Sequence, residues 1–464
     1  HEQRRQTDGP GKDEVNRMND FRKTAQEMLE FIRISPTCFH AVANIGRMLE
    51  AAGFQQLQEK EEWKLEKGGR YYTERNDSSV IAFVIPEKEV GIRGFHMAAA
   101  HSDSPCFKIK EKPELTVEEH YLRLNTEKYG GMILSTWLDR PLSVAGRLAV
   151  KNGNGIEGRL VNIDRDLCVI PNVAIHMNRE MNKGVEYNPQ VDLLPLLADV
   201  TFDAHDAQTA SENAEEQPET VEKPTLAALA AETAGVDAET ILGEDLFLYT
   251  RQEGKMIGAK GEFVLSPRLD DLQSAFALTK AFTESTPAEY INLCAVFDNE
   301  EVGSGTRQGA DSTFLEDTLQ RITEGLQEGH STYLRWVADS FLISADNAHA
   351  VHPNHPEKAD PANRPYLNGG IVIKYHGSQK YTTDGISAAR MKDYCERAKV
   401  PYQTYANRSD IAGGSTLGNI STAHVSVSSV DIGLPQLAMH SAVETAGMKD
   451  TEYAVRALKE FWGE

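Results

Sequence analysis

Apolar residues recur at helical spacing near both ends of the chain. One face of a helix predicted from residue 19 would carry Phe21, Ala25, Met28, Leu29 and Ile32. Pro36 would end this helix, and a second helix is predicted over 39–52, where Gly53 would end it. A last helix is predicted over about 440–462.

Short apolar runs between these helices are typical of strands buried in a sheet. They are residues 79–85, 94–100, 291–297, 340–345 and 423–432. Helical patterns lie between them, one of them marked by Leu269, Leu272, Phe276 and Phe282. Strands that alternate with helices over a long chain predict an α/β fold, with a central mixed sheet and helices on both of its faces.

Residues 106–239 have a different pattern, with few helical signals. Short β-like runs at 147–150 and 160–163 are separated by a turn rich in Asn and Gly. We therefore predict a mostly β domain that is inserted between two parts of the α/β domain, residues 19–105 and 240–464.

Two segments are predicted to lack regular structure. Residues 203–222 hold seven acidic residues and no Lys or Arg. Such a segment buries too little apolar surface to offset the entropy of ordering, so we expect a mobile acidic loop. Residues 1–18 are polar without periodicity and are expected to be a disordered tail or an artificial extension, because Met18 resembles a natural start.

The composition narrows the possible functions. The 464 residues include 48 Lys and Arg against 70 Asp and Glu, and this net charge of −22 argues against binding to nucleic acid or anionic membranes. No apolar run of about 18 residues predicts a membrane span, and no N-terminal apolar segment indicates a signal peptide. Five cysteines without a CxxC motif are typical of a reduced compartment, so a cytoplasmic location is expected.

Histidines and acidic residues stand where predicted strands end or where a helix begins. These positions are His101 and Asp103, Asp270, Glu300 and Glu301, Asp346, and His440. Sites in open α/β sheets form at the carboxyl ends of strands. We therefore expect five separate segments to converge on one crevice.

The residue types at these positions suit a pair of divalent metal ions. Histidines and carboxylates ligate zinc and similar ions, and two ions roughly 3.5–4 Å apart need a bridging carboxylate. One member of the Glu300-Glu301 pair can bind metal while the other acts as general base. Taken singly, each position has an ordinary interpretation, such as a solvated Glu-Glu pair or an N-capping Asp270, and only the combination favours a metal site.

With these residues the chain resembles the aspartyl aminopeptidases, a family of dinuclear zinc aminopeptidases that includes vacuolar aminopeptidase I. The resemblance covers residues 19–464 and rests on seven motifs in order. They are residues 35–42 (SPTCFHAV), 101–105 (HSDSP), 267–271 (PRLDD), 297–304 (FDNEEVGS), 346–354 (DNAHAVHPN), 414–418 (GSTLG) and 436–441 (QLAMHS).

The resemblance implies a zinc-peptidase-like fold and a role for each matching residue. The implied ligands are His101 and Asp346 for one metal, Glu301 and His440 for the other, and Asp270 as the bridge. Glu300 would be the general base, and Asp103 would orient His101. Zinc is the default for this ligand set, with Co²⁺ or Mn²⁺ as alternatives.

The resemblance further implies an assembly and a substrate pocket. The inserted β domain would form a dimer and send His176 into the partner's active site, where it would stabilise the oxyanion. Six dimers would form a tetrahedral dodecamer around an enclosed chamber. Lys374 and Tyr381 fall where the family contacts substrate, and a Lys there would pair with an N-terminal Asp or Glu.

Two positions depart from the family pattern. Asp271 stands where the family usually has Asn, and this extra carboxylate is expected to increase the local negative charge and tighten metal binding. Ser409 replaces the more frequent Asn of an Arg-Asn-Asp sequence. A run of three histidines, His349, His352 and His355, is expected to shape the loop beside the site or to bind adventitious metal.

The leading hypothesis is therefore a metal-dependent aminopeptidase that releases single N-terminal residues from peptides, with a preference for Asp or Glu. One alternative keeps the same chemistry with an apolar or basic preference. A remote alternative is an inactive shell protein that binds peptides. The intact set of five ligands and Glu300 argues against that last interpretation, because a degenerate homologue would be expected to have lost at least one of them.

Overall fold

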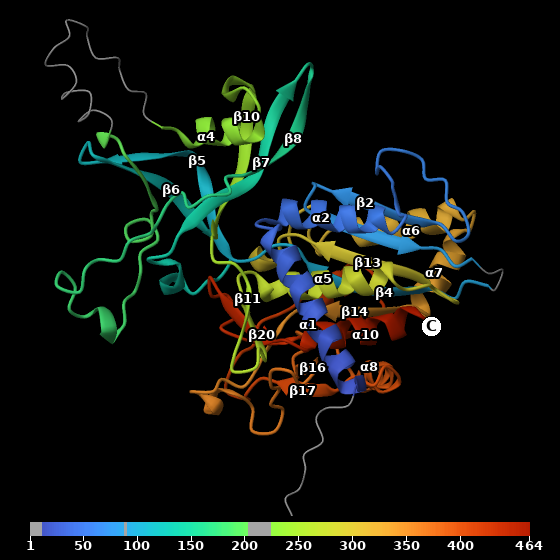
Figure 1. The fold of residues 1–464 in the computed structure, drawn as a ribbon. Helices are drawn as coiled ribbons and strands as arrows, with labels where there is room; N and C mark the ends of the chain where they lie inside the picture. Colours follow the sequence, from blue (N-terminus) through green and yellow to red (C-terminus); the bar gives the residue numbers. More distant parts are fainter. Residues whose placement is uncertain (1–11, 88–90, 203–223) are drawn as a thin grey trace, which may run out of the picture.

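The central sheet is mixed, as predicted. The computed structural model describes residues 12–87, 91–202 and 224–464, and nine strands within these residues form the sheet (Figure 1). In spatial order they are β1 (Gln55–Gln56), β2 (Arg70–Arg75), β3 (Ser79–Val84), β13 (Ile291–Phe297), β4 (Phe95–His101), β14 (Phe341–Ala345), β18 (Ser428–Gly433), β16 (Ile371–Tyr375) and β17 (Tyr402–Ala406). The four strands from β13 to β18 run parallel, so their carboxyl ends meet at one edge.

Alternate residues of the central strands face two helical layers. In β4, Ala98 and Ala100 belong to one apolar core, while Met97 and Ala99 belong to the other. The first core is covered by α1 (Lys12–Arg33), α2 (Cys38–Ala51), α5 (Leu269–Thr283), α8 (Gly385–Arg397) and α10 (Asp450–Trp462). The second core is covered by α6 (Phe314–Gly325), α7 (His330–Ala338) and α9 (Leu417–His424). The predicted α/β architecture is therefore confirmed.

A separate antiparallel sheet carries its own apolar core and projects away from the helical layers (Figure 1). Its six described strands are, in spatial order, β8 (Gly155–Asn162), β7 (Leu142–Asn152), β10 (Ile241–Thr250), β5 (Cys106–Val117), β6 (Tyr121–Tyr129) and β9 (Leu196–Asp199). Helix α4 (Leu226–Ala234) packs on this core through Leu226 and Ala230. The predicted boundary at 239 falls before β10, which pairs with both β7 and β5, so the β domain extends to Thr250.

A small third sheet lies beside the central one. Its five described strands are, in spatial order, β11 (Lys255–Ile257), β12 (Phe263–Ser266), β20 (Glu444–Gly447), β19 (Pro435–Leu437) and β15 (Ala348–His349). The 3₁₀ turns of the described chain are η1 (Leu134–Trp137), η2 (Met181–Lys183), η4 (Ala238–Thr240), η5 (Glu300–Val302) and η6 (Pro356–Lys358). Among the described residues, no helix combines the length and the apolarity that crossing a membrane requires.

Three predicted boundaries differ from the structure. Helix α1 starts at Lys12, inside the tail predicted over 1–18; it packs on the core through Met18, while Asn16 and Arg17 are exposed. The helix predicted from 440 starts only at Asp450, because 444–447 pairs as β20 with β12 and β19. The strand predicted over 423–432 begins at Ser428, after α9. The acidic loop predicted over 203–222 lies outside the described residues.

Candidate metal centre

The predicted ligands lie at the carboxyl edge of the parallel strands. His101 is the last residue of β4, and its two neighbours in the sheet are β13, which leads to the Glu300-Glu301 turn, and β14, which leads to Asp346. Asp270 lies at the start of α5, and His440 lies between β19 and β20. Five segments that are distant in sequence thus converge on one place.

Asp270 lies between two imidazole rings. Its Oδ1 atom is 3.5 Å from His101 Nε2, and its Oδ2 atom is 3.3 Å from His440 Nε2. Each oxygen of one carboxylate therefore faces a different histidine. This is the arrangement that a carboxylate bridging two metal ions requires.

Each histidine has a second carboxylate on its own side of Asp270. Asp346 Oδ1 lies 3.7 Å from His101 Nε2, and Glu301 Oε2 lies 3.4 Å from His440 Nε2. Two groups of predicted ligands consequently share Asp270, and their roles as metal ligands stay predictions. Glu300 Oε2 lies 3.8 Å from His101 Nε2, beside the first group.

The buried polar atoms of this cluster suit a divalent cation. Within the described residues, His101 Nε2, Asp270 Oδ1 and Glu301 Oε1 are buried without a hydrogen-bond partner. Buried polar atoms are nearly always paired in proteins, so this convergence of unpaired nitrogen and oxygen atoms indicates a cation site. Imidazole nitrogens and carboxylate oxygens are ligands that zinc accepts.

The charges of the cluster are strongly coupled. Burial opposes protonation of His440, but its contacts with Asp270 and Glu301 outweigh burial and raise its pKa to about 11. Burial likewise opposes ionisation of Asp270, yet His101 and His440 hold the pKa of this carboxyl below its ordinary value. The cluster therefore favours positive charge between its carboxylates, which metal ions would supply.

Asp103 organises both sides of the cluster. Its Oδ1 atom is 3.2 Å from His101 Nδ1, and its carboxylate accepts the backbone N–H groups of Glu300 at 3.2 Å and Glu301 at 3.1 Å. The hydroxyl of Tyr129, on β6 of the β domain, donates to Asp103 Oδ2 at 2.7 Å. This geometry supports the predicted orienting role and extends it to the Glu-Glu turn, a contact that the sequence did not reveal.

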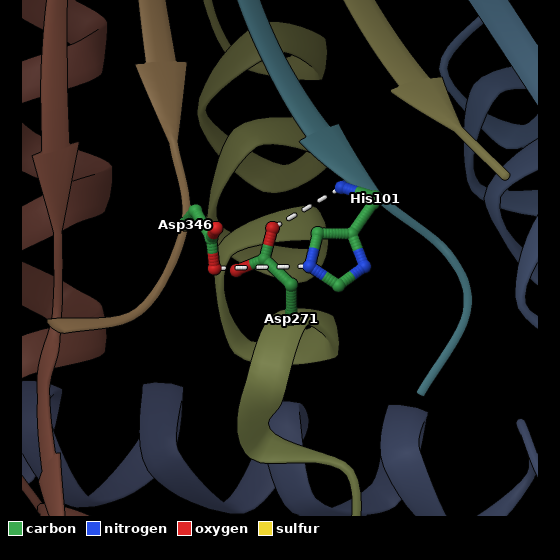
Figure 2. A group of neighbouring side chains, drawn as sticks. All are labelled: His101, Asp271 and Asp346. Atoms are coloured by element: carbon green, nitrogen blue, oxygen red, sulfur yellow. Dashed lines mark hydrogen bonds and ion pairs between the residues drawn. The ribbon is translucent and has the colours of Figure 1, made fainter. Parts of the chain in front are cut away.

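Asp271 lies against the same cluster. Figure 2 shows its side chain beside His101 and Asp346, and ligand atoms of all three lie within 4.8 Å of one another. Its Oδ2 atom accepts the backbone N–H of His101 at 3.1 Å. Burial raises the pKa of Asp271 well above its ordinary value, and the charges of Asp346 and Asp270 raise it further. This departure from the family pattern thus acts directly on the first ligand group.

The predicted substrate residues are buried beside the first ligand group. Lys374 Nζ donates to the carbonyl of Asn347 at 3.0 Å and lies 5.4 Å from the centre of the Tyr381 ring. Burial lowers the pKa of Lys374, but the charges of Asp346, Tyr381, Asp431 and Asp270 together outweigh this effect and raise it. An adjoining pocket of about 410 Å³ is lined by residues that include His349 and Tyr405, which supports the expectation that the histidine run shapes a loop beside the site.

His176 is the one predicted site residue that the structure does not bring to the cluster. It is exposed in the β domain, in a segment where Val173, Ile175 and Met177 are also exposed. A role in the active site of a second subunit therefore stays a prediction.

The sequence analysis missed one residue of the site, Glu444. Its carboxylate accepts hydrogen bonds from the backbone N–H groups of Asp270 and His440, and no spacing pattern marked it in the sequence.

A central mixed sheet between helical layers, with histidines and carboxylates at the ends of its parallel strands, defines a metallohydrolase of the zinc-peptidase type. The profile of the family described as Aminopeptidase I zinc metalloprotease (M18) matches residues 31–462. The chain therefore belongs to the M18 family, and it is a metal-dependent aminopeptidase. The predicted family and enzyme class are confirmed.

Relatives of known sequence and structure agree with this assignment. A probable M18 family aminopeptidase 2 of Clostridium novyi is 47% identical over 444 residues, which cover 95% of this chain and 98% of the relative. A solved complex of Ape4 and Nbr1 contains a chain that is 37% identical, with a TM-score of 0.89, and the match covers 96% of this chain and 86% of that one. A chain of the mApe1 dodecamer of S. cerevisiae is 26% identical, with a TM-score of 0.79, and the match covers 95% of this chain and 97% of that one.

Proposed function

We propose that this aminopeptidase holds two divalent metal ions and releases single N-terminal residues, preferably Asp or Glu, from peptides. The observation that carries the dinuclear site is the Asp270 carboxylate, whose two oxygens face His101 and His440 separately. Asp346 would complete the first site and Glu301 the second. Zinc is the proposed metal, with Co²⁺ and Mn²⁺ as alternatives.

Glu300 is the proposed general base. Bound metal ions would supply polarisation of the scissile carbonyl and a lower pKa for the attacking water. Glu300 would take the water proton and deliver it to the leaving amine. Burial raises the pKa of Glu300 to about 9, with the charge of His101 opposing this shift and that of Asp346 adding to it.

The test of this chemistry is hydrolysis of a peptide panel. The panel carries N-terminal Asp, Glu, Leu or Lys and is offered to the purified enzyme after chelation and after Zn²⁺, Mn²⁺ or Co²⁺ is restored. We expect metal-dependent release of one residue, and a loss of about 10²–10⁴-fold in Glu300→Gln. No release under any metal would contradict the proposal and favour the peptide-binding shell.

The proposed acidic preference rests on Lys374. Of the two predicted substrate residues, Lys374 is the cation, and it lies beside the first ligand group. Its contact with Tyr381 and its place beside Asp346 support a role in binding an acidic side chain. We expect Lys374→Gln to lose activity on Asp and Glu peptides much more than on Leu peptides. The matched control is Lys380→Gln, since Lys380 donates instead to the carbonyl of Gly413. A wild-type preference for Leu or Lys would favour the alternative specificity.

A homo-oligomer is proposed for the active form, with a tetrahedral dodecamer as its full size. The mApe1 dodecamer among the similar structures supports this assembly. If His176 acts in the partner's site, a mixture of His176→Ala and Glu300→Gln subunits should recover activity that neither variant has alone. Light scattering would give the size of the oligomer, and failure of complementation in a confirmed mixed oligomer would contradict the role of His176.

A cytoplasmic location of the enzyme stays a prediction.

A further inference from the structure

Glu444 connects two backbone segments that carry metal ligands. It is the first residue of β20, and its side chain is buried. Its Oε2 atom accepts the backbone N–H of Asp270 at 3.0 Å, and its Oε1 atom accepts the backbone N–H of His440 at 2.8 Å. One carboxylate thus spans two segments that are 170 residues apart in the chain.

Neither segment is held by regular secondary structure at the ligand itself. Asp270 has φ −83° and ψ 107°, outside helical geometry, although it lies in the first turn of α5. His440 has φ 67°, in the left-handed region, in the connection between β19 and β20. The separation of Asp270 Oδ2 from His440 Nε2, 3.3 Å, therefore depends on contacts outside the helix and strand ladders.

Asp270 and His440 differ in their other hydrogen-bond partners. The carbonyl of Asp270 accepts the Ser104 hydroxyl at 2.8 Å, so Asp270 has a second anchor within the catalytic domain. The ring of His440 contacts the Gly131 carbonyl through Nδ1 at 2.8 Å, and the His440 carbonyl accepts the N–H of Ile133 at 2.9 Å. Both of these partners belong to the segment that follows β6 in the β domain. Glu444 is thus the link from His440 back to Asp270.

We infer that Glu444 is a positioning residue for the metal on the His440 and Glu301 side. By fixing both backbones on one rigid carboxylate, it sets the distance between the bridging oxygen and the His440 imidazole. Partners that orient metal ligands typically change affinity about 10–100-fold when they are replaced. The inference rests on the proposed dinuclear site. Glu444 would set the affinity of the enzyme for one of the two metal ions at that site.

The test compares zinc binding by the wild-type enzyme and Glu444→Gln. The amide keeps one acceptor oxygen but turns an N–H group toward one of the two backbone donors, so one hydrogen bond is lost. We expect one dissociation constant to rise about 10–100-fold and the other to stay unchanged. Calorimetry and metal analysis after dialysis would measure both, and excess zinc should restore kcat in the variant.

Asp450→Asn is the matched control. Asp450 is also a buried carboxylate that accepts two backbone N–H groups, but from Asn368 at 2.7 Å and Gly370 at 2.9 Å. We expect this variant to bind both ions with wild-type affinity. Glu444→Asp, which is shorter by one methylene, provides a second measurement if Glu444→Gln does not fold, and the same selective loss is expected.

The outcomes separate this inference from the proposed function. Fewer than two ions on the wild-type enzyme would contradict the dinuclear site itself. Two ions on the wild type and two unchanged affinities in the folded Glu444 variants would overturn only the role of Glu444. Equal weakening of both ions, or the same loss in Asp450→Asn, would mean a general structural role and would also overturn it.

Discussion

Asp271 places a carboxyl group next to the backbone of His101, a proposed metal ligand. Its side chain accepts the N–H of His101, and burial raises its pKa well above the ordinary range. A cation bound by His101 and Asp346 would favour the ionised form of Asp271. The residue can therefore add to metal affinity by its charge as well as hold the end of β4.

Replacing Asp271 by Asn should separate these two effects. The amide oxygen can keep the hydrogen bond from His101, so the fold should survive, but the charge is removed. We expect the ion on the His101 side to bind about tenfold more weakly. Competition with a chelator would measure this, and unchanged affinity in a folded variant would show that the charge does not reach the metal.

Helix α8 illustrates how one element holds part of the site. It starts directly after the segment that carries Tyr381, and it packs on β16, which carries Lys374. The Asp384 carboxylate accepts the N–H groups of Ile386 and Ser387, and the Ser387 hydroxyl accepts the N–H of Asp384. This capping box fixes where the helix begins and therefore where the preceding segment ends.

Asp384→Ala should destabilise the protein by about 1 kcal/mol in chemical unfolding. The hydrogen bond from the Ser387 backbone lowers the pKa of Asp384 in the folded protein. The ionised cap therefore stabilises above the ordinary Asp pKa of about 3.9, and its contribution declines as the pH falls through the lower folded value.

A control for this cap lies on the same helix. Asp393→Ala removes an equal charge from an exposed pair with Arg397, and a smaller effect of about 0.3–0.5 kcal/mol is expected. Equal losses in both variants would contradict the capping argument.

At the scale of the whole molecule, the β domain contacts the proposed metal site. Tyr129 donates to Asp103, and the Gly131 carbonyl lies 2.8 Å from the Nδ1 atom of His440. Arg147 of β7 fastens the domain to the turn before β3 through the Asn76 carbonyl at 2.7 Å. The cluster between the domains is rich in carboxylates, in a chain of net charge −22, so bound cations should stabilise the whole fold.

Chelation should consequently lower the midpoint of thermal unfolding, and zinc should restore it. Binding to the folded state alone adds about 2.7 kcal/mol per site when free zinc is 100 times its dissociation constant. Differential scanning calorimetry would measure the shift. Magnesium at equal ionic strength is the control for charge screening, and an equal shift with magnesium would argue against a site selective for zinc.

Local pattern was sufficient for the main elements and for the convergence of the predicted ligands at one edge of the sheet. Buried strands such as β4 and β13 are largely apolar runs, and the polar residues at or just after their carboxyl ends, His101 and the Glu300-Glu301 pair, are recognisable by type and position. Ordered motifs then sufficed for the family. These features are local in the chain, and composition and spacing record them directly.

Long-range pairing decided the rest. Three features depend on partners far away in the chain. They are the position of β13 between β3 and β4, the use of 444–447 as a strand instead of a helix, and the extension of the β domain to Thr250. So do the contacts of Glu444 and Gly131 with His440. Periodicity describes which face of a segment is apolar, but not which other segment covers that face, and only the folded chain brings these groups within hydrogen-bonding distance.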